Sequence, residues 1–317
     1  MRPVTVWERN AFLSVTGLFN KAEKIFGEEA MKVAIMTDTN SGISVEEGAR
    51  TGVHVLPMPV LIDGKTYYEG VTLTHEEFYR CQGEGQAVST SQPAPSDVLA
   101  MWDRLLEEYD QIVHIPMSSG LSASCETAIG LAEDYDGRVQ VVNNHRISVT
   151  QRNSVSDAQI LAEQGCSAKE IKEELERMAF DSIIYIGVDT LEYLKRGGRI
   201  TPAAAAMGTI LQLKPLLKIE GERLDAFAKV RGRKACQQKL VEAMKHSVEE
   251  FHKIDGPLCI GAAGSFLTQE EGEQWRALAA EIFPGEYIRY DPLALSIGCH
   301  TGPGAFGMAV SRCLRRD

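Results

Sequence analysis

Apolar residues recur every three or four positions within the first 30 residues of the chain. This spacing places them on one side of an α-helix, so it predicts an amphipathic helix. Such a helix buries its stripe against the body of the protein, or against a partner or a membrane surface. We expect this helix to be an appendage to a fold that begins at Met31. The stripe consists of Trp7, Ala11, Val15, Leu18, Ala22 and Ile25.

Between residue 31 and about residue 180, short apolar segments alternate with amphipathic ones. Strands that alternate with helices in this way form βαβ units and a mostly parallel sheet. The dipeptide Asp63-Gly64, between two extended segments, predicts a hairpin inside this region. The sequence therefore predicts a Rossmann-like α/β domain over residues 31–180. We expect strands at 32–36, 53–62, 65–68, 111–115 and 139–142, helices at 44–51, 74–82, 96–109, 121–134, 148–164 and 168–179, and, just past the domain boundary, a strand at 182–188.

The pattern changes after residue 180. Segments 216–220 and 223–230 flank Gly221 and predict a second hairpin. Further strands are expected at 258–263 and 286–290, with helices between them. We interpret residues 181–317 as a second domain of the α+β class.

The 317 residues carry a formal net charge of -11, and the pI is near 5.2. Nucleic-acid binding draws its affinity from clustered Lys and Arg, so we expect no nucleic-acid partner. A permanent polybasic membrane anchor is excluded on the same ground. Basic residues do gather at 195–199, 229–234 and 312–316, and we interpret the last two groups as mainly solvated surface.

The seven cysteines are scattered, odd in number and without a Cys-x-x-Cys pair. This pattern predicts reduced thiols, and neither a disulfide framework nor a zinc site. No apolar run approaches the roughly 20 residues that a membrane span needs. The N-terminus also lacks the apolar core of a signal peptide, so we expect a cytoplasmic protein.

Two loops of the first domain are rich in small hydroxyl residues. Ligands of parallel α/β sheets bind at loops that follow the strands. The segment 89–96 offers Thr90 and Ser91 before a helix, although a helix cap followed by proline explains it equally well. The segment 116–122 follows a buried strand and opens a helix, whose free N–H groups suit an anion. Serine also caps helices, so this second pattern is suggestive rather than specific.

Two segments of the second domain contribute further candidate ligand-binding residues. His300 lies beside two glycines in what we interpret as a strand-to-helix turn, where it can donate a hydrogen bond to a ligand. A single histidine in a turn is, however, more often structural. Arg196 or Arg199 could clamp a carboxylate or phosphate, unless both only form the basic last turn of a helix. None of the standard hydrolase, P-loop or zinc-protease signatures occurs in the chain.

Taken in order, these segments resemble the motifs of the DegV family from about Met31 to the C-terminus. The motif most specific to the family is Asp189-Thr190-Leu191-Glu192-Tyr193-Leu194, which is followed by Gly197-Gly198-Arg199-Ile200. The other matching motifs are Thr37-Asp38-Thr39, Thr90-Ser91-Gln92-Pro93, Ser118-Ser119-Gly120-Leu121-Ser122, Lys214-Pro215-Leu216-Leu217 and His300-Thr301-Gly302-Pro303-Gly304.

The resemblance implies a two-domain carrier that holds a long-chain fatty acid between its domains and has no cofactor or catalytic activity of its own. It also implies a separate fatty acid kinase as partner, which makes acyl phosphate for phospholipid synthesis, and it leaves room for transient contact with a membrane surface. Thr90 and Ser122 would hydrogen-bond the carboxylate, with His300 and Arg196 or Arg199 nearby. The candidate ligand-binding residues are thus Thr90, Ser91, Ser119, Gly120, Ser122, Arg196, Arg199 and His300.

The chain departs from the family pattern in two internal places. Ala123-Ser124-Cys125-Glu126 stands where the family usually has Gly-Thr-Tyr-Gln. Asn143-Asn144-His145 stands in place of an Asp-Ser-Lys segment. Both changes leave the expected carboxylate hydroxyls in place.

Two classes of function remain open. A carrier predicts an apolar tunnel, lined by residues such as Ile186, Met207, Ile210 and Leu213, and lipid that co-purifies with the protein. An acyl-transfer enzyme or esterase would instead use Ser122 as nucleophile and His300 as base. The carrier is favoured because the sequence shows neither an orienting acid nor a nucleophile elbow beside this pair.

Overall fold

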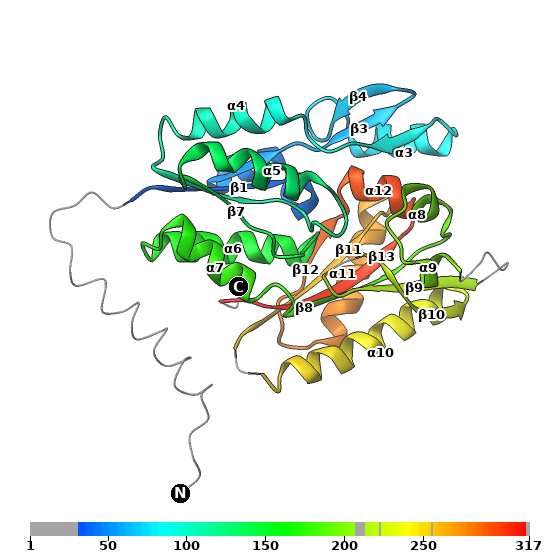
Figure 1. Ribbon diagram of the computed structural model, residues 1–317. Helices are drawn as coiled ribbons and strands as arrows, with labels where there is room; N and C mark the ends of the chain where they lie inside the picture. The colour runs from blue at the N-terminus through cyan, green and yellow to red at the C-terminus, as the bar shows by residue number, and fades with distance from the viewer. Residues whose placement is uncertain (1–30, 207–212, 222, 255, 315–317) are drawn as a thin grey trace, which may run out of the picture. The chain divides into compact units, whose positions relative to one another are not determined.

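The computed structural model describes residues 31–206, 213–221, 223–254 and 256–314 (Figure 1). The predicted N-terminal helix, and Met207 and Ile210 among the expected tunnel residues, lie outside these ranges. Contacts group Lys32–Asp317 into one unit. Its described part contains two main sheets and a third, smaller one.

The first sheet is parallel, with the strand order β2-β1-β6-β7. Successive residues of its strands face opposite sides, so Met36 packs towards α4 and α5 while Ile35 packs towards α6 and α7. This arrangement confirms the predicted α/β class. The elements are β1 (Val33–Asp38), α2 (Val45–Thr51), β2 (Val53–Leu56), α4 (Pro95–Leu105), β6 (Gln111–Ile115), α5 (Ser124–Ala132), β7 (Val139–Val141), α6 (Val149–Glu163) and α7 (Ala168–Arg177), with short 3-10 turns η1 (Thr39–Ser41) and η2 (Glu133–Tyr135).

The small sheet has the order β4-β3-β5 and precedes α4 in the chain. Its hairpin turns at Asp63-Gly64, as predicted, and both residues have positive φ angles, of 49° and 79°. The third strand was missed, because it is only three residues long and was interpreted as loop. It matters for the site, since it ends at Thr90. The elements are β3 (Pro59–Ile62), β4 (Lys65–Tyr68), α3 (His75–Gly83) and β5 (Val88–Thr90).

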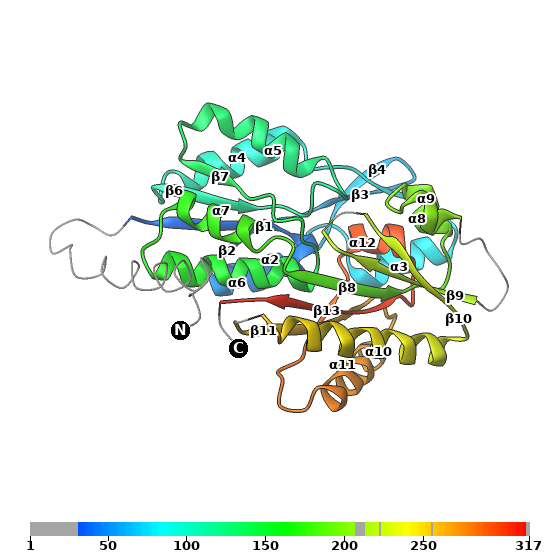
Figure 2. The same ribbon diagram turned by 60° about the horizontal axis from the view of Figure 1, so that its bottom comes forward.

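The second main sheet is mixed, with the order β10-β9-β8-β13-β11-β12. One face packs against α10 and α11. Helix α6 contacts β11 and β13 of this sheet and also β1 and β6 of the first, so it lies between the two sheets (Figures 1 and 2). The elements are β8 (Ser182–Gly187), α8 (Glu192–Gly197), α9 (Pro202–Ala205), β9 (Leu213–Ile219), β10 (Asp225–Arg231), α10 (Arg233–Phe251), β11 (Leu258–Gly264), α11 (Gln269–Ile282), β12 (Arg289–Pro292), α12 (Leu295–Thr301) and β13 (Phe306–Arg312).

The segment around His300 runs in the opposite sense to the prediction. Helix α12 precedes the glycine turn and strand β13 follows it, whereas a strand followed by a helix was expected. The short helix is almost fully buried, and its mixture of glycine, serine, threonine and aliphatic residues has no clear helical period. Strand β13 is central in its sheet, so nearly all of its residues are buried and no alternation marks it.

The cysteine prediction was wrong for one pair. Cys259 on β11 and Cys313 just after β13 form a disulfide, and the two strands are antiparallel neighbours. The partners are 54 residues apart in sequence, so their spacing gave no signal. Cys81, Cys125, Cys236 and Cys299 are free thiols.

Two features are absent from the part of the chain that the structure describes. None of the described helices has both the length and the apolar character that crossing a membrane requires. Nor do the described residues include a group of three or more His, Cys, Asp or Glu side chains that is suited to a metal ion.

Ion pairs connect α6 to α2, beside the first sheet, and to β12 of the mixed sheet. Arg152 on α6 contacts Glu47 of α2 at 2.7 Å and Asp291 of β12 at 2.9 Å. Arg289 contacts the same two carboxylates, at 2.7 and 3.2 Å. The cluster therefore fixes α6 relative to the mixed sheet, one turn away from the cavity described next.

Candidate functional site

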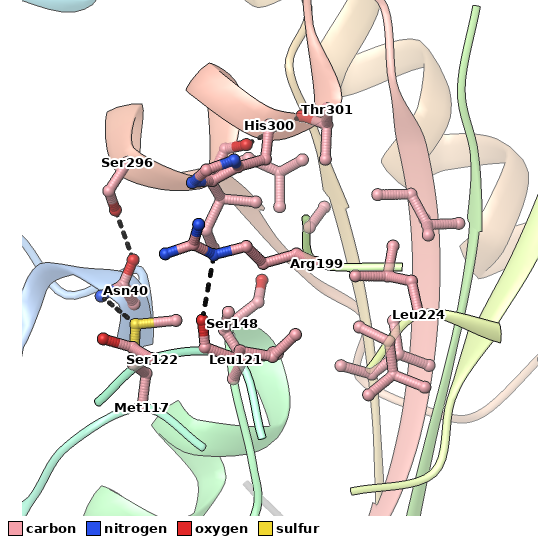
Figure 3. Close-up of a pocket in the computed structure, with 18 of the residues that line it drawn as sticks. Asn40, Met117, Leu121, Ser122, Ser148, Arg199, Leu224, Ser296, His300 and Thr301 are labelled. Carbon is pink, nitrogen blue, oxygen red and sulfur yellow. Dashed lines mark hydrogen bonds between the residues drawn. The ribbon is translucent and has the colours of Figure 1, made fainter. Parts of the chain in front are cut away.

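A cavity lies between the carboxyl ends of the first sheet and the inner face of the mixed sheet (Figure 3). It encloses about 910 Å³, counting the part that is open to solvent. This volume is in the range of small-molecule sites. Asn40, Met58 and Met117 follow strands β1, β2 and β6 and line it, so the cavity lies where the topology of a parallel sheet predicts a ligand.

The wall formed by the mixed sheet is aliphatic. Ile184 on β8 pairs with Ile219 on β9, so both side chains reach the same face. In the next row, Ile186 pairs with Gly307, which in turn pairs with Ala263. The small residues leave room and the isoleucines supply apolar surface. Ile186 was an expected tunnel residue and lies in this wall, whereas Leu213 does not line the cavity.

Thr90 and His300 meet at the polar end of the cavity. Strand β5 supplies Thr90 and α12 supplies His300, and 3.0 Å separates Thr90 Oγ1 from His300 Nε2. Burial, together with the charge of Arg199, lowers the pKa of His300 to about 4. The imidazole is therefore neutral at pH 7. Gly197 of α8 packs so closely on this ring that a Cβ atom there would overlap it.

In the loop after β6, one candidate residue lines the cavity and two others make hydrogen bonds outside it. Ser122 lines the cavity, and its Oγ accepts the N–H of Ser124 at 3.2 Å. Ser119 does not line it; its hydroxyl accepts Asn143 Nδ2 at 2.9 Å. Gly120 lies outside the lining too, and its N–H donates to Ser118 Oγ at 3.2 Å. These two candidates thus build the turn that presents Ser122.

The two candidate arginines have different surroundings. Arg199 lines the cavity, where its Nε donates to the carbonyl of Leu121 at 3.2 Å and its Nη1 donates to the carbonyl of Gly197. Its guanidinium group extends between α12 and the loop that carries Ser122 (Figure 3). Arg196 is exposed, 5.9 Å from the centre of the Tyr193 ring, and does not line the cavity.

Comparison with known proteins identifies the family. The model of the family described as "Uncharacterised protein, DegV family" matches residues 32–312. The chain belongs to the DegV family. A DegV domain-containing protein of Deinococcus radiodurans is 32% identical over 284 residues, which is 88% of this chain and 98% of the relative.

Solved DegV structures share the fold. A DegV family protein of Thermus thermophilus, described by its fatty acid binding, is 31% identical, with a TM-score of 0.78 over 89% of this chain and 100% of its own. DegV of Bacillus subtilis, described as a fatty acid binding protein, is 26% identical, with a TM-score of 0.77 over 89% and 99% of the two chains.

Sequence reasoning missed several polar residues of this DegV cavity. Asn40 is fully buried; its Oδ1 accepts the hydroxyl of Ser296, and its Nδ2 lies 3.1 Å from Met117 Sδ. Asn40 follows β1 in the Thr-Asp-Thr loop, so its place after a parallel strand was a usable signal. Ser148 and Ser296, at the starts of α6 and α12, had none, because only tertiary packing turns them towards the cavity.

The geometry of the DegV site does not pair Ser122 with His300 as nucleophile and base. His300 hydrogen-bonds to Thr90, while Ser122 Oγ accepts the backbone N–H of Ser124. Nucleophilic catalysis needs the base within hydrogen-bond reach of the nucleophile, with a third group orienting it. The arrangement suits binding better than acyl transfer.

Proposed function

We propose that the chain binds one long-chain fatty acid in this cavity, with the carboxylate held by Thr90, Ser122, His300 and Arg199. The observation that carries the proposal is the division of a single cavity into an aliphatic wall and an end rich in hydroxyl groups. The solved relatives from Thermus thermophilus and Bacillus subtilis are themselves described as fatty-acid-binding.

The acyl tail would supply most of the affinity. A tail of roughly 14 methylenes gains about 0.8 kcal/mol for each one buried, or on the order of 11 kcal/mol in total. Loss of translational and rotational freedom offsets part of this gain. The isoleucine rows of β8 and β9 offer the surface for such burial.

The polar end would orient the ligand. A desolvated carboxylate is costly unless donors surround it. Hydroxyl groups and a neutral imidazole satisfy it without sealing it into a fully buried ion pair, and partly exposed Arg199 adds a single positive charge. The acid would then be oriented and still releasable.

We further propose that the chain is a carrier that presents the acid to a separate fatty acid kinase. The head-group end is accessible, because Ser91 is exposed and Thr90, Ser122 and His300 are only partly buried. The sequence has no P-loop of its own, so phosphoryl transfer would fall to the partner. A cytoplasmic location and transient contact with a membrane surface remain expectations of this role.

Mass spectrometry of lipid extracted from the purified protein tests the central claim. We expect one long-chain fatty acid per chain in the wild type. The double variant Thr90→Ala/Ser122→Ala should bind at least about tenfold more weakly, because about 1 kcal/mol is lost with each hydrogen bond to the carboxylate.

Ser89→Ala is the matched control, since it removes an exposed hydroxyl next to Thr90 on β5, outside the cavity lining. It should leave affinity unchanged. Equal affinities for wild type and the double variant would remove Thr90 and Ser122 from the head-group role. The absence of any bound or titratable fatty acid would refute the function itself.

A further inference from the structure

Ser148 is a buried serine whose hydroxyl faces the cavity. It is the N-cap residue of α6, and only 6% of its surface is exposed. Its side chain makes no capping hydrogen bond, and no other partner for its hydroxyl occurs among the described residues. Figure 3 shows it in the cavity lining.

The first turn of α6 adds backbone donors at the same place. A helix start leaves N–H groups without intrahelical partners and carries a partial positive charge. Within the described ranges, the N–H groups of Val149, Thr150 and Gln151 have no acceptor, and of these three residues Val149 lines the cavity. In contrast, the capping hydroxyls of Ser167 and Thr268 bond to the N–H groups of α7 and α11.

The position of Ser148 points to the carboxyl end of a bound acid. Its N–H donates to the carbonyl of Asn40 at 2.9 Å, and Asn40 bonds through its side chain to Ser296 of α12, the helix that carries His300. The Ser148 hydroxyl lies in the cavity lining without a partner among the described residues, so a ligand oxygen there could form a hydrogen bond with it.

We propose that Ser148 and the first turn of α6 form a second polar subsite, which binds a hydroxyl group carried by the acyl chain close to its carboxyl end. The inference rests on the proposed fatty acid binding and names the class of ligand: a hydroxylated long-chain acid. A ligand hydroxyl can accept a hydrogen bond from a helix N–H group. It can also donate a hydrogen bond to the Ser148 hydroxyl or accept one from it.

A second carboxylate would fit this subsite less well. The cation next along α6, Arg152, is already bound by Glu47 and Asp291. Asp38 is also near, because its carboxylate accepts Gln151 Nε2 of the same helical turn at 3.3 Å. An added charge would therefore lack a free counter-ion and meet a carboxylate.

Competition binding with a fluorescent fatty acid tests the subsite. The ligands are hexadecanoic acid and its 2-hydroxy, 3-hydroxy and 16-hydroxy derivatives. The wild type should prefer the 2- or 3-hydroxy acid by about two- to tenfold, which corresponds to one net hydrogen bond. The 16-hydroxy acid should gain nothing, because its hydroxyl lies at the far end of the tail.

Ser148→Ala should abolish this preference while keeping its affinity for hexadecanoic acid. Ser122→Ala is the matched control: it should weaken all four acids and preserve the preference. If the wild type shows no preference, or Ser148→Ala retains it, the subsite is refuted, and Ser148 binds only water. If no acid binds the wild type at all, the proposed function fails together with the subsite.

Discussion

At the scale of single residues, the site depends on close packing around neutral donors. His300 is neutral because it is buried beside a cation, and its orientation depends on Thr90 on one side and Gly197 on the other. Gly197 has no unusual backbone angle, so what it provides is space. A residue outside the cavity lining thus positions a residue inside it.

Gly197→Ala should therefore weaken fatty acid binding. Overpacking of a filled site typically costs about 1–3 kcal/mol, which predicts a loss of about fivefold or more in affinity as the ring shifts. Titration with a fluorescent fatty acid measures the change. Gly130→Ala is the control, because open space surrounds that position on α5, and alanine there should stabilise the helix slightly. Unchanged affinity in Gly197→Ala would show that the His300 ring is free to move.

At the scale of secondary-structure elements, α12 is held at its start by Glu69. Glu69 Oε1 accepts the N–H of Leu295 at 2.8 Å, and its Oε2 accepts the hydroxyl of Thr39 at 2.8 Å. One carboxylate therefore connects α12, which carries Ser296 and His300, to the η1 turn. Burial raises the pKa of Glu69 to about 7, and the charge of Asp38 acts in the same direction.

This shift predicts a pH dependence of stability. The folded protein binds the Glu69 proton more tightly than the unfolded chain does, so stability should fall as the pH rises from about 4.5 to about 7. The contribution is about 3 kcal/mol, at 1.36 kcal/mol for each pKa unit over the rise from 4.5 to about 7. Tyr79 and Cys299 also face Glu69, but their pKa values are raised, so both stay neutral over this range.

Urea unfolding of wild type and Glu69→Gln across pH 4.5 to 8 measures this contribution as a difference between the two proteins. Subtraction removes the effect of other carboxyls with raised pKa values, such as Asp291. The free-energy difference should change with pH in favour of the variant as the pH rises. Parallel curves would mean that Glu69 does not titrate in this range.

At the scale of the whole molecule, the two main sheets meet through α6 and through the cluster of Arg152, Glu47, Arg289 and Asp291. Arg152 and Asp291 are both almost fully buried. Removing one partner of a buried pair leaves an uncompensated charge, which typically costs about 3–5 kcal/mol. The helix that these contacts hold, α6, begins at the wall of the cavity.

Arg152→Met should lower the free energy of unfolding by about 3–5 kcal/mol, as measured by chemical denaturation. Adding Asp291→Asn should recover part of the loss, since it removes the buried charge left behind. Strictly additive effects in this double-mutant cycle would contradict the coupling between the two side chains.

The sequence alone determined what local pattern encodes. The alternation of apolar segments predicted the parallel sheet, and the Asp63-Gly64 turn was placed correctly because two-residue hairpins require positive φ angles. The ordered motifs indicated the family, and with it Thr90, Ser122, Arg199 and His300, which all line one cavity.

Only the tertiary structure decided which side chains share that cavity and which support it. It showed that Arg199 and Ser122 line the cavity, whereas Arg196 and Ser119 do not. It also placed Asn40, Ser148 and Ser296 in the lining. It also paired Cys259 with Cys313. The physical reason is separation along the chain. Helical and strand periods depend on residues that are neighbours in the sequence. These contacts instead join segments that are up to 256 residues apart and meet only in the folded protein.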